Sequence, residues 1–188
     1  EDNLKARLAY STISQLSYIV LGALLASSLG IIGGTMHIAT HAFGKITLFF
    51  CAGAIYAASG EIDISRMRGI GRRMPFTMAA FFMASLSIIG LPPFGGLWSK
   101  WYLALGTLDT DQYVLLAVLL ISTLLNIAYL IPIPLRAFFC PPEDVPEGGM
   151  REAPALSVIA LSVTALGCFV LFLFPGPLYR LAAMLVAP

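Results

Sequence analysis

The hydrophobic residues of this chain form five long stretches separated by short polar connectors. The stretches lie near residues 8–29, 31–59, 76–108, 113–139 and 155–174. A bilayer core of ~30 Å is crossed by about 20 apolar residues in a helix, and backbone groups in lipid need internal hydrogen bonds. The stretches lack the alternating apolar and polar residues of barrel strands. The pattern therefore predicts an all-α fold, a polytopic transmembrane helix bundle of about five spans.

The third stretch is interrupted by helix-breaking residues. Between positions 88 and 101 it contains Gly90, Pro92, Pro93, Gly95 and Gly96. Proline lacks an amide donor and glycine weakens a helix. The flanking pieces, 76–89 and 97–108, are each too short to cross alone, which favours one discontinuous helix over a hairpin loop between two short helices. Irregular backbone at this depth must be buried by protein or reached by water.

The composition excludes an ordinary soluble domain. The chain is 59% hydrophobic and 11% charged, with a mean hydropathy of +0.88, whereas soluble domains carry about 25% charged residues. A net charge of +1 provides no clustered basic footprint for nucleic acid. The three cysteines are too far apart for a metal motif or a disulfide framework. We expect Cys51, Cys140 and Cys168 to be packing residues, and we expect no metal and no cofactor.

We expect a single transmembrane domain over residues 1–188. The segment 141–154 is rich in proline, glycine and charge, and is predicted to be a cytoplasmic loop. Residues 155–188 are predicted to form a C-terminal span followed by an interfacial segment, with Tyr179 and Arg180 at headgroup depth. No leader pattern opens the chain, so we expect no signal peptide and a place within a longer protein.

The charged connectors predict the direction of crossing. With five crossings, one side of the membrane receives Lys5, Arg7, Arg66, Arg68, Arg72, Arg73, Arg136 and Arg151. The other side receives Asp109, Asp111 and Arg180. By the positive-inside rule the basic side is cytoplasmic. We therefore expect an integral protein of the bacterial inner membrane, or its topological equivalent in an organelle, with a cytoplasmic N-terminus and an outside C-terminus.

Ionisable residues inside the predicted spans are few and regularly spaced. His37, His41 and Lys45 recur at every fourth position, which places them on one helix face about 6 Å apart along the axis. With Arg136 near the end of the fourth stretch assigned to the basic side, Lys45 and Lys100 are the only basic residues predicted at depth in the membrane, and all ten acidic residues lie outside the stretches. A lysine at this depth costs about 2.5 to 3.5 kcal/mol on insertion scales. Neither lysine is therefore explained by stability.

These four residues predict a proton relay. Burial disfavours the charged form of a lysine, and histidine exchanges protons near neutral pH. Water near the break at Pro92 would connect Lys100 to the other three. Two alternatives stay open, because the histidines could be hydrogen-bonded core residues and Lys100 could extend its ammonium to the interface. With no carboxylate inside the spans, a counter-charge is expected from elsewhere in a longer protein or from a neighbouring subunit.

Four motifs resemble one known family. They are DNLKARLAYSTISQLSYIVLG at 2–22, HIATHAFGKITLFFCAGAIY at 37–56, ISRMRGIGRRMP at 64–75 and GLPPFGGLWSKW at 90–101. The motifs resemble the antiporter-like proton-translocating subunits shared by respiratory complex I and the multisubunit Mrp-type monovalent cation/proton antiporters. The resemblance covers residues 2 to about 140, which we take as a family-like core over 1–140, and is closest to the Mrp-type D subunits.

The resemblance implies two inverted repeats, each with a discontinuous helix, of which this chain is similar to the C-terminal part. By motif, Lys45 occupies the family's central lysine position, with His37 and His41 as the adjoining histidines. Lys100 occupies the position of the charged residue that ends the broken helix. One departure is Gly44, where many relatives carry a bulky residue. We expect this glycine either to leave room for water or to loosen helix packing.

The leading functional interpretation is a proton-translocating subunit of a multisubunit Na⁺/H⁺ antiporter. A near alternative is a proton-pumping membrane subunit of complex I (NADH:quinone oxidoreductase) or of a membrane hydrogenase, with no redox centre of its own. A third interpretation is a non-conducting membrane scaffold. The expected partners are other membrane subunits, protons, Na⁺ as the candidate cation and the lipid bilayer, but no nucleic acid. We expect transport rather than enzymatic catalysis.

Overall fold

The computed structural model describes residues 1–141 and 151–186. Over these ranges the chain is helical and forms no β-strand, which confirms the predicted fold class. The elements are α1 (Leu4–Leu24), α2 (Ser28–Ser59), the 3-10 turn η1 (Ile64–Arg66), α3 (Ile70–Arg73), α4 (Pro75–Ile89), α5 (Gly96–Asp109), α6 (Tyr113–Leu130), α7 (Pro132–Phe139), α8 (Ala155–Leu173) and α9 (Gly176–Ala183).

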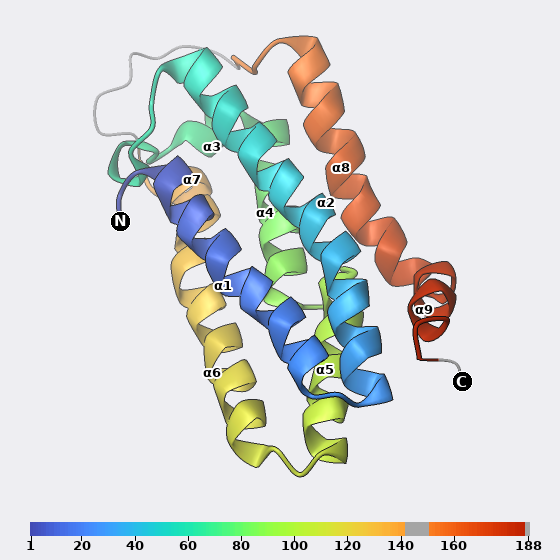
Figure 1. The fold of residues 1–188 in the computed structure, drawn as a ribbon. Helices are drawn as coiled ribbons and strands as arrows, with labels where there is room; N and C mark the ends of the chain where they lie inside the picture. The colour runs from blue at the N-terminus through green and yellow to red at the C-terminus, as the bar shows by residue number, and fades with distance from the viewer. Residues whose placement is uncertain (142–150, 187–188) are drawn as a thin grey trace.

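The long helices form a bundle in which the chain runs back and forth between two ends (Figure 1). α1 leaves the N-terminal end and α2 returns to it. α4 and α5 together run to the far end, α6 and α7 return, and α8 runs out again. α2 is the central element, because it packs against α1, α4, α5, α8 and α9. This arrangement matches the five predicted traverses of the chain.

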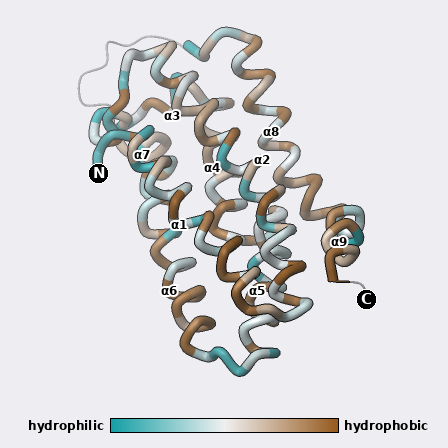
Figure 2. Tube along the Cα trace, in the orientation of Figure 1, coloured by the Kyte–Doolittle hydropathy of each residue, from teal (hydrophilic) through white to brown (hydrophobic). Residues whose placement is uncertain are grey.

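Three helical stretches of the described chain are long and apolar enough to cross a membrane alone: Ser28–Ser59, Tyr113–Phe139 and Ala155–Leu173. Figure 2 shows hydrophobic residues along much of α6 and α8, with hydrophilic residues at the connectors. The other two predicted spans are not among these stretches, and their length and polarity explain why. α4 and α5 are each short, and α1 is 21 residues long but carries polar side chains such as Ser11 and Gln15 on its buried face.

The predicted helix break is present. α4 ends at Ile89, Gly90 follows with a positive φ of 89°, and α5 begins at Gly96. The segment between them is held by a hydrogen bond from the Gly95 amide to the Cys168 carbonyl of α8 at 2.9 Å. Gly96 lies so close to α4 that a Cβ there would be 1.8 Å from the Ser87 carbonyl oxygen. The break is therefore a tightly packed part of the bundle.

Gly44 has a role that the sequence did not predict. A Cβ at this position would lie 2.8 Å from Cδ1 of Ile88. The space above Gly44 is thus filled by an α4 side chain, and the glycine allows α2 and α4 to approach closely. It neither leaves room for water nor loosens the packing between these helices.

The later segments agree in outline with the elements predicted from the sequence. The helix over 113–139 is interrupted at Ile131, immediately before Pro132, as a proline inside a helix requires. Beyond Phe174 the chain forms α9, which packs against α2 and places the Tyr179 ring 5.4 Å from that of Tyr102. Most of the predicted cytoplasmic loop, residues 142–150, lies outside the described residues.

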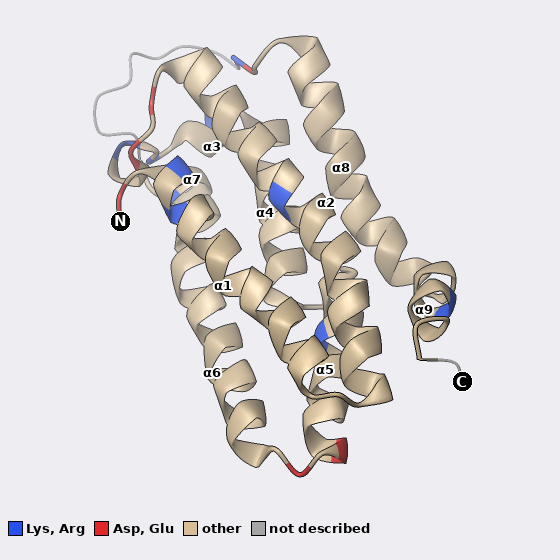
Figure 3. Ribbon diagram, in the orientation of Figure 1, with Lys and Arg blue, Asp and Glu red and all other residues tan. Residues whose placement is uncertain are grey.

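The connectors divide the charges between the two ends of the bundle (Figure 3). At the N-terminal end, Arg7 donates to the Tyr129 carbonyl and the Arg151 amide donates to the Arg73 carbonyl. The start of α1 is joined to η1, because the Asp2 carboxylate accepts hydrogen bonds from the Ser65 hydroxyl and amide. These bonds, the hydroxyl first, hold the pKa of Asp2 below its usual range.

Candidate functional site

Lys45 is held inside the bundle by α1. Its side chain is only 5% exposed. The ammonium Nζ donates to the Ser11 hydroxyl at 2.6 Å and to the Leu8 carbonyl at 3.2 Å. Figure 3 shows the corresponding basic segment in the middle of α2, away from the charged ends of the bundle. Lys45 therefore faces the α1 side of the bundle, one turn beyond His41.

Lys100 is held by the helix break. Its side chain is 6% exposed, and Nζ donates to the carbonyl of Ile89, the last residue of α4, at 2.9 Å. The C-terminal end of a helix carries a partial negative charge that favours a cation. A weaker contact of 3.5 Å reaches the Thr123 hydroxyl of α6. The Lys100 ammonium is thus directed inward, and the break supplies its main acceptor.

The two histidines lie between the lysines on the buried face of α2. The His37 and His41 rings stack with centroids 5.8 Å apart and planes at 18°. His37 Nδ1 is 2.9 Å from the Ser99 hydroxyl, next to Lys100 in sequence. Nε2 of each histidine is buried and forms no hydrogen bond to the described protein atoms. Each ring therefore keeps one nitrogen available to exchange a proton.

Tyr18 of α1 connects these groups. The Lys100 ammonium lies 4.9 Å from the centroid of its ring, a cation–π distance. His37 meets the same ring edge-on at 5.3 Å. The structure therefore brings Lys100 and His37 together around one aromatic side chain, and His41 and Lys45 follow along α2.

A set of uncharged polar residues on α1 and α6 was not predicted from the sequence. We call it the α1–α6 ladder, and its members are Ser11, Gln15, Tyr18, Ser122, Asn126 and Tyr129. In each helix the members are spaced by four and then three residues, so they share one face. That spacing within apolar stretches is the feature that could have identified them. The hydrogen bonds of the ladder connect Lys45 to Tyr18, and the Tyr18 ring lies under the Lys100 ammonium.

Neither lysine contacts a carboxylate within the described ranges; the hydrogen bonds of both ammonium groups go to neutral oxygens. The same ranges contain no group of three histidine, cysteine or acidic residues that could hold a metal ion. The local chemistry is therefore that of two buried amines joined by imidazole, hydroxyl and amide groups. Of these, the amine and imidazole groups can hold and pass protons.

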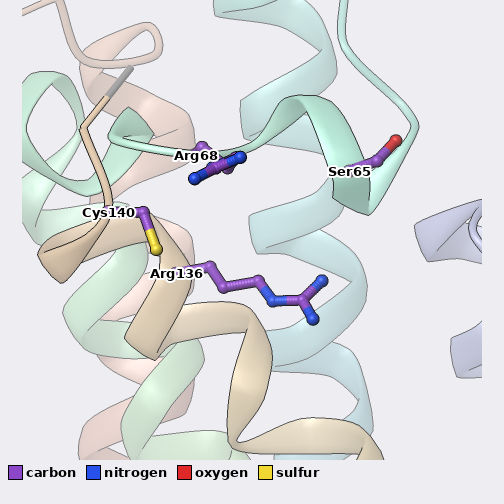
Figure 4. Close-up of a pocket in the computed structure, with 4 residues that line it drawn as sticks. All are labelled: Ser65, Arg68, Arg136 and Cys140. Carbon is purple, nitrogen blue, oxygen red and sulfur yellow. The ribbon is translucent and has the colours of Figure 1, made fainter. Parts of the chain in front are cut away.

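A separate pocket lies at the basic end of the bundle. It has a volume of about 480 Å³ and is lined by Ser65, Arg68, Arg136 and Cys140 (Figure 4). The arginines reach it from the segment after η1 and from α7. Cys140 is half-buried at this pocket, whereas Cys51 and Cys168 are fully buried packing residues. None of the predicted relay residues lines the pocket.

Comparison with known proteins finds similarity to membrane subunits of two kinds of complex. A family model for the transmembrane region of NADH:quinone oxidoreductase and Mrp antiporters matches residues 1–126. The chain is 39% identical over 178 residues to NADH-quinone oxidoreductase subunit N of Desulforudis audaxviator, with 89% of this chain and 36% of the relative covered. It is 31% identical over 166 residues to the D subunit of the Na(+)/H(+) antiporter of Alkalihalophilus pseudofirmus, with 86% and 34% covered.

The fold is that of solved structures of the same type. The chain matches a chain of the Mrp complex from Dietzia sp. DQ12-45-1b with a TM-score of 0.89 at 22% identity, covering 97% of this chain and 42% of that one. It spans little more than a third of the length of the two sequence relatives, at 36% and 34%. The matches over residues 1–126 and at 39% identity show that the chain belongs to the transmembrane antiporter-like family shared by NADH:quinone oxidoreductases and Mrp antiporters.

Proposed function

We propose that this chain is the part of a proton-translocating membrane subunit that passes protons between Lys45 and Lys100. The observation that carries the proposal is the burial of both lysines, 5% and 6% exposed, with their ammonium groups bound to neutral acceptors alone within the described residues. A buried lysine without a counter-charge readily gives up its proton, because the neutral amine needs less solvation. These are the conditions that a relay requires.

The histidine pair supplies the route between the lysines. A proton leaving Lys100 would reach His37, which shares the Tyr18 ring with it, then His41 and finally Lys45. The separations call for water between the groups, and the free Nε2 atoms of the histidines are suited to bind it. The reverse direction uses the same groups.

We further propose that the subunit works in a multisubunit monovalent cation/proton antiporter, with Na⁺ as the candidate cation. The 31% identity to the D subunit of an antiporter supports this interpretation. The second candidate is a redox-driven proton pump of the complex I type, which the 39% identity to a subunit N favours. In that case the redox chemistry would belong to partner subunits. The relay is the same in both cases.

We place the subunit in a bacterial inner membrane, with the basic end of the bundle in the cytoplasm, because basic connectors favour that side. Other membrane subunits would cover the rest of the bundle and provide the carboxylate that the lysines lack here.

The test uses the full-length subunit in its native complex, assayed in inverted membrane vesicles. Lys45→Ala and Lys100→Ala should each lower proton translocation at least about tenfold, as loss of an acid–base group does, while the complex still assembles. Lys5→Ala is the matched control, since that lysine lies at the bundle end over the Tyr56 ring. Translocation by both variants at the wild-type rate would instead favour a scaffold.

The driving reaction is distinguished in the same vesicles. Addition of Na⁺ to vesicles with an imposed pH gradient should release protons if the complex is an antiporter. Addition of NADH and quinone should build a gradient if it is a redox pump. Either response should disappear in Lys45→Ala.

A further inference from the structure

The hydrogen bonds of the α1–α6 ladder have a defined direction. The Tyr129 hydroxyl donates to Oδ1 of Asn126 at 2.7 Å, and Nε2 of Gln15 donates to the same oxygen at 3.3 Å. An amide oxygen only accepts, so the proton of Tyr129 is committed to Asn126. The short contact of 2.5 Å between Ser11 and Tyr129 must then be donated by Ser11. The Ser11 oxygen is left to accept from Lys45.

The other half of the ladder reaches the second lysine. Nδ2 of Asn126 donates to the Tyr18 hydroxyl at 3.4 Å, and Tyr18 donates to the Ser122 hydroxyl at 2.7 Å. The ring of Tyr18 lies beneath the Lys100 ammonium. Asn126 therefore stands between the two lysines, with its acceptor directed toward the Lys45 side and its donor toward the Lys100 side.

We propose that the α1–α6 ladder is a second connection between Lys45 and Lys100, in which Asn126 fixes the hydrogen-bond direction so that Ser11 always offers a lone pair to Lys45. This inference rests on the proposed relay. An amide cannot pass a proton along as a hydroxyl does, so the ladder positions Lys45 and favours its ammonium form, while the histidines conduct. Asn126, Tyr129 and Ser11 are positioning residues in this account.

The effect of the ladder on the protonation of Lys45 has to be separated from the effects of neighbouring ionisable groups. The buried or part-buried titratable or charged groups on the surrounding elements are His37, His41 and Cys51 on α2, Arg7 and Tyr18 on α1, Lys100 and Tyr102 on α5, Cys168 on α8 and Tyr129 on α6. α4 has none. Only Lys45 donates to Ser11 among the described residues, so a variant at Ser11 reports on Lys45.

The experiment measures the pH profile of proton translocation by the complete complex in vesicles. Ser11→Ala removes the acceptor of the Lys45 ammonium, and Tyr129→Phe frees the Ser11 hydroxyl to donate to the neutral amine. Both changes weaken the protonated form of Lys45. The alkaline limit of activity should therefore move to lower pH by about one unit in each variant, the shift expected from one charge-assisted hydrogen bond.

A double variant tests whether the two residues act through one path. In the Ser11→Ala background, Tyr129→Phe should add little further shift, because its effect passes through Ser11. Ser17→Ala and Tyr10→Phe are the matched controls, since both residues are exposed on α1 and lie outside the ladder. Both controls should keep the wild-type profile.

Two results would overturn the ladder. One is a wild-type pH profile in Ser11→Ala, even with a lower overall rate, and the other is fully additive shifts in the double variant. If Tyr129→Phe fails to assemble, the smaller Ser11→Ala truncation decides alone. Failure of the relay itself is recognised separately, because Lys45→Ala would then retain translocation. Loss of translocation in Lys45→Ala with unshifted ladder variants rejects the ladder alone.

Discussion

Lys45 and Lys100 are buried to the same extent, but their ammonium groups bind different kinds of acceptor. Lys100 binds a carbonyl at the free end of α4, which no helical amide uses. Lys45 binds a hydroxyl and the Leu8 carbonyl, which lies within α1 and also accepts from Thr12. Lys100 therefore binds the carbonyl of a helix end, whereas the short hydrogen bond of Lys45 goes to a hydroxyl whose direction is set by its own partner, Tyr129.

The packing of the helix break depends on single glycines. Gly96→Ala should destabilise the complex by about 1–3 kcal/mol, the cost of overpacking, because its Cβ would meet the Ser87 carbonyl oxygen at 1.8 Å. Thermal unfolding of the solubilised complex measures the change. The control is Gly53→Ala, whose Cβ would have no neighbour within 4 Å. That variant should be neutral or stabilising, since alanine favours a helix; equal effects at both sites would contradict the packing described here.

At the residue scale the sequence predicted the charged groups but missed their partners. Lys45 and Lys100 stand out because a charge in an apolar stretch is costly. Asn126 and Tyr129 do not stand out in the sequence, because uncharged polar side chains are common in membrane helices. Their role depends on α6 lying beside α1, more than a hundred residues apart in sequence. No local pattern contains that pairing.

At the scale of the element, α4 is a helix whose two ends are both satisfied by charged residues from elsewhere. Its N-terminus lacks a side-chain cap, because Met74 cannot provide one. The Glu152 carboxylate takes this place, accepting from the Phe76 amide at 2.7 Å and the Thr77 hydroxyl at 2.6 Å. The Lys100 ammonium binds the other end. Negative charge at the start and positive charge at the end both complement the helix dipole.

Removal of the Glu152 carboxylate should weaken α4. Glu152→Ala leaves the Phe76 and Thr77 amides without their acceptor, and should lower stability by about 1–2 kcal/mol. Glu61→Ala is the control, because that carboxylate forms no hydrogen bond with the described residues. Thermal unfolding at equal salt compares the two. An equal or larger loss in Glu61→Ala would argue against the cap.

The apolar stretches and the helix-breaking residues of the sequence predicted most elements, but they did not predict how α4 is capped. The Pro-Gly segment indicated where α4 ends and α5 begins, and Pro132 indicated the interruption between α6 and α7. Glu152 was assigned to a solvated loop because it lies among Pro, Gly and charge. Its place on α4, more than seventy residues earlier in the chain, is a tertiary contact.

At the scale of the whole molecule, the described residues form a helix bundle with a large apolar exterior. Exposed hydrophobic residues follow the outer faces of α1, α6 and α8. The chain covers about a third of its relatives, 36% and 34%. Under the proposed function, lipid and other membrane subunits would cover these faces. The interior polar groups, by contrast, are already enclosed within this part.

The bilayer account can be tested on the outer face of α6. Leu124 and Val114 are 65% and 76% exposed, but Leu124 lies in the helix interior and Val114 in its first turn. Leu124→Lys should reduce insertion by about 2.5–3.5 kcal/mol, whereas Val114→Lys can reach the interface and should cost little. The amount of inserted subunit measures both. Equal insertion would mean that this face is not in lipid.

In the proposed relay, Lys45 must release and regain a proton during each transport cycle. Arginine keeps a positive charge at this position but does not deprotonate in proteins. The most direct test is the proton translocation rate of Lys45→Arg in the full-length subunit within its assembled complex. If Lys45 has to deprotonate, the rate should be at least about tenfold below wild type. A wild-type rate in Lys45→Arg would show that Lys45 acts only as a fixed charge, and would contradict the relay.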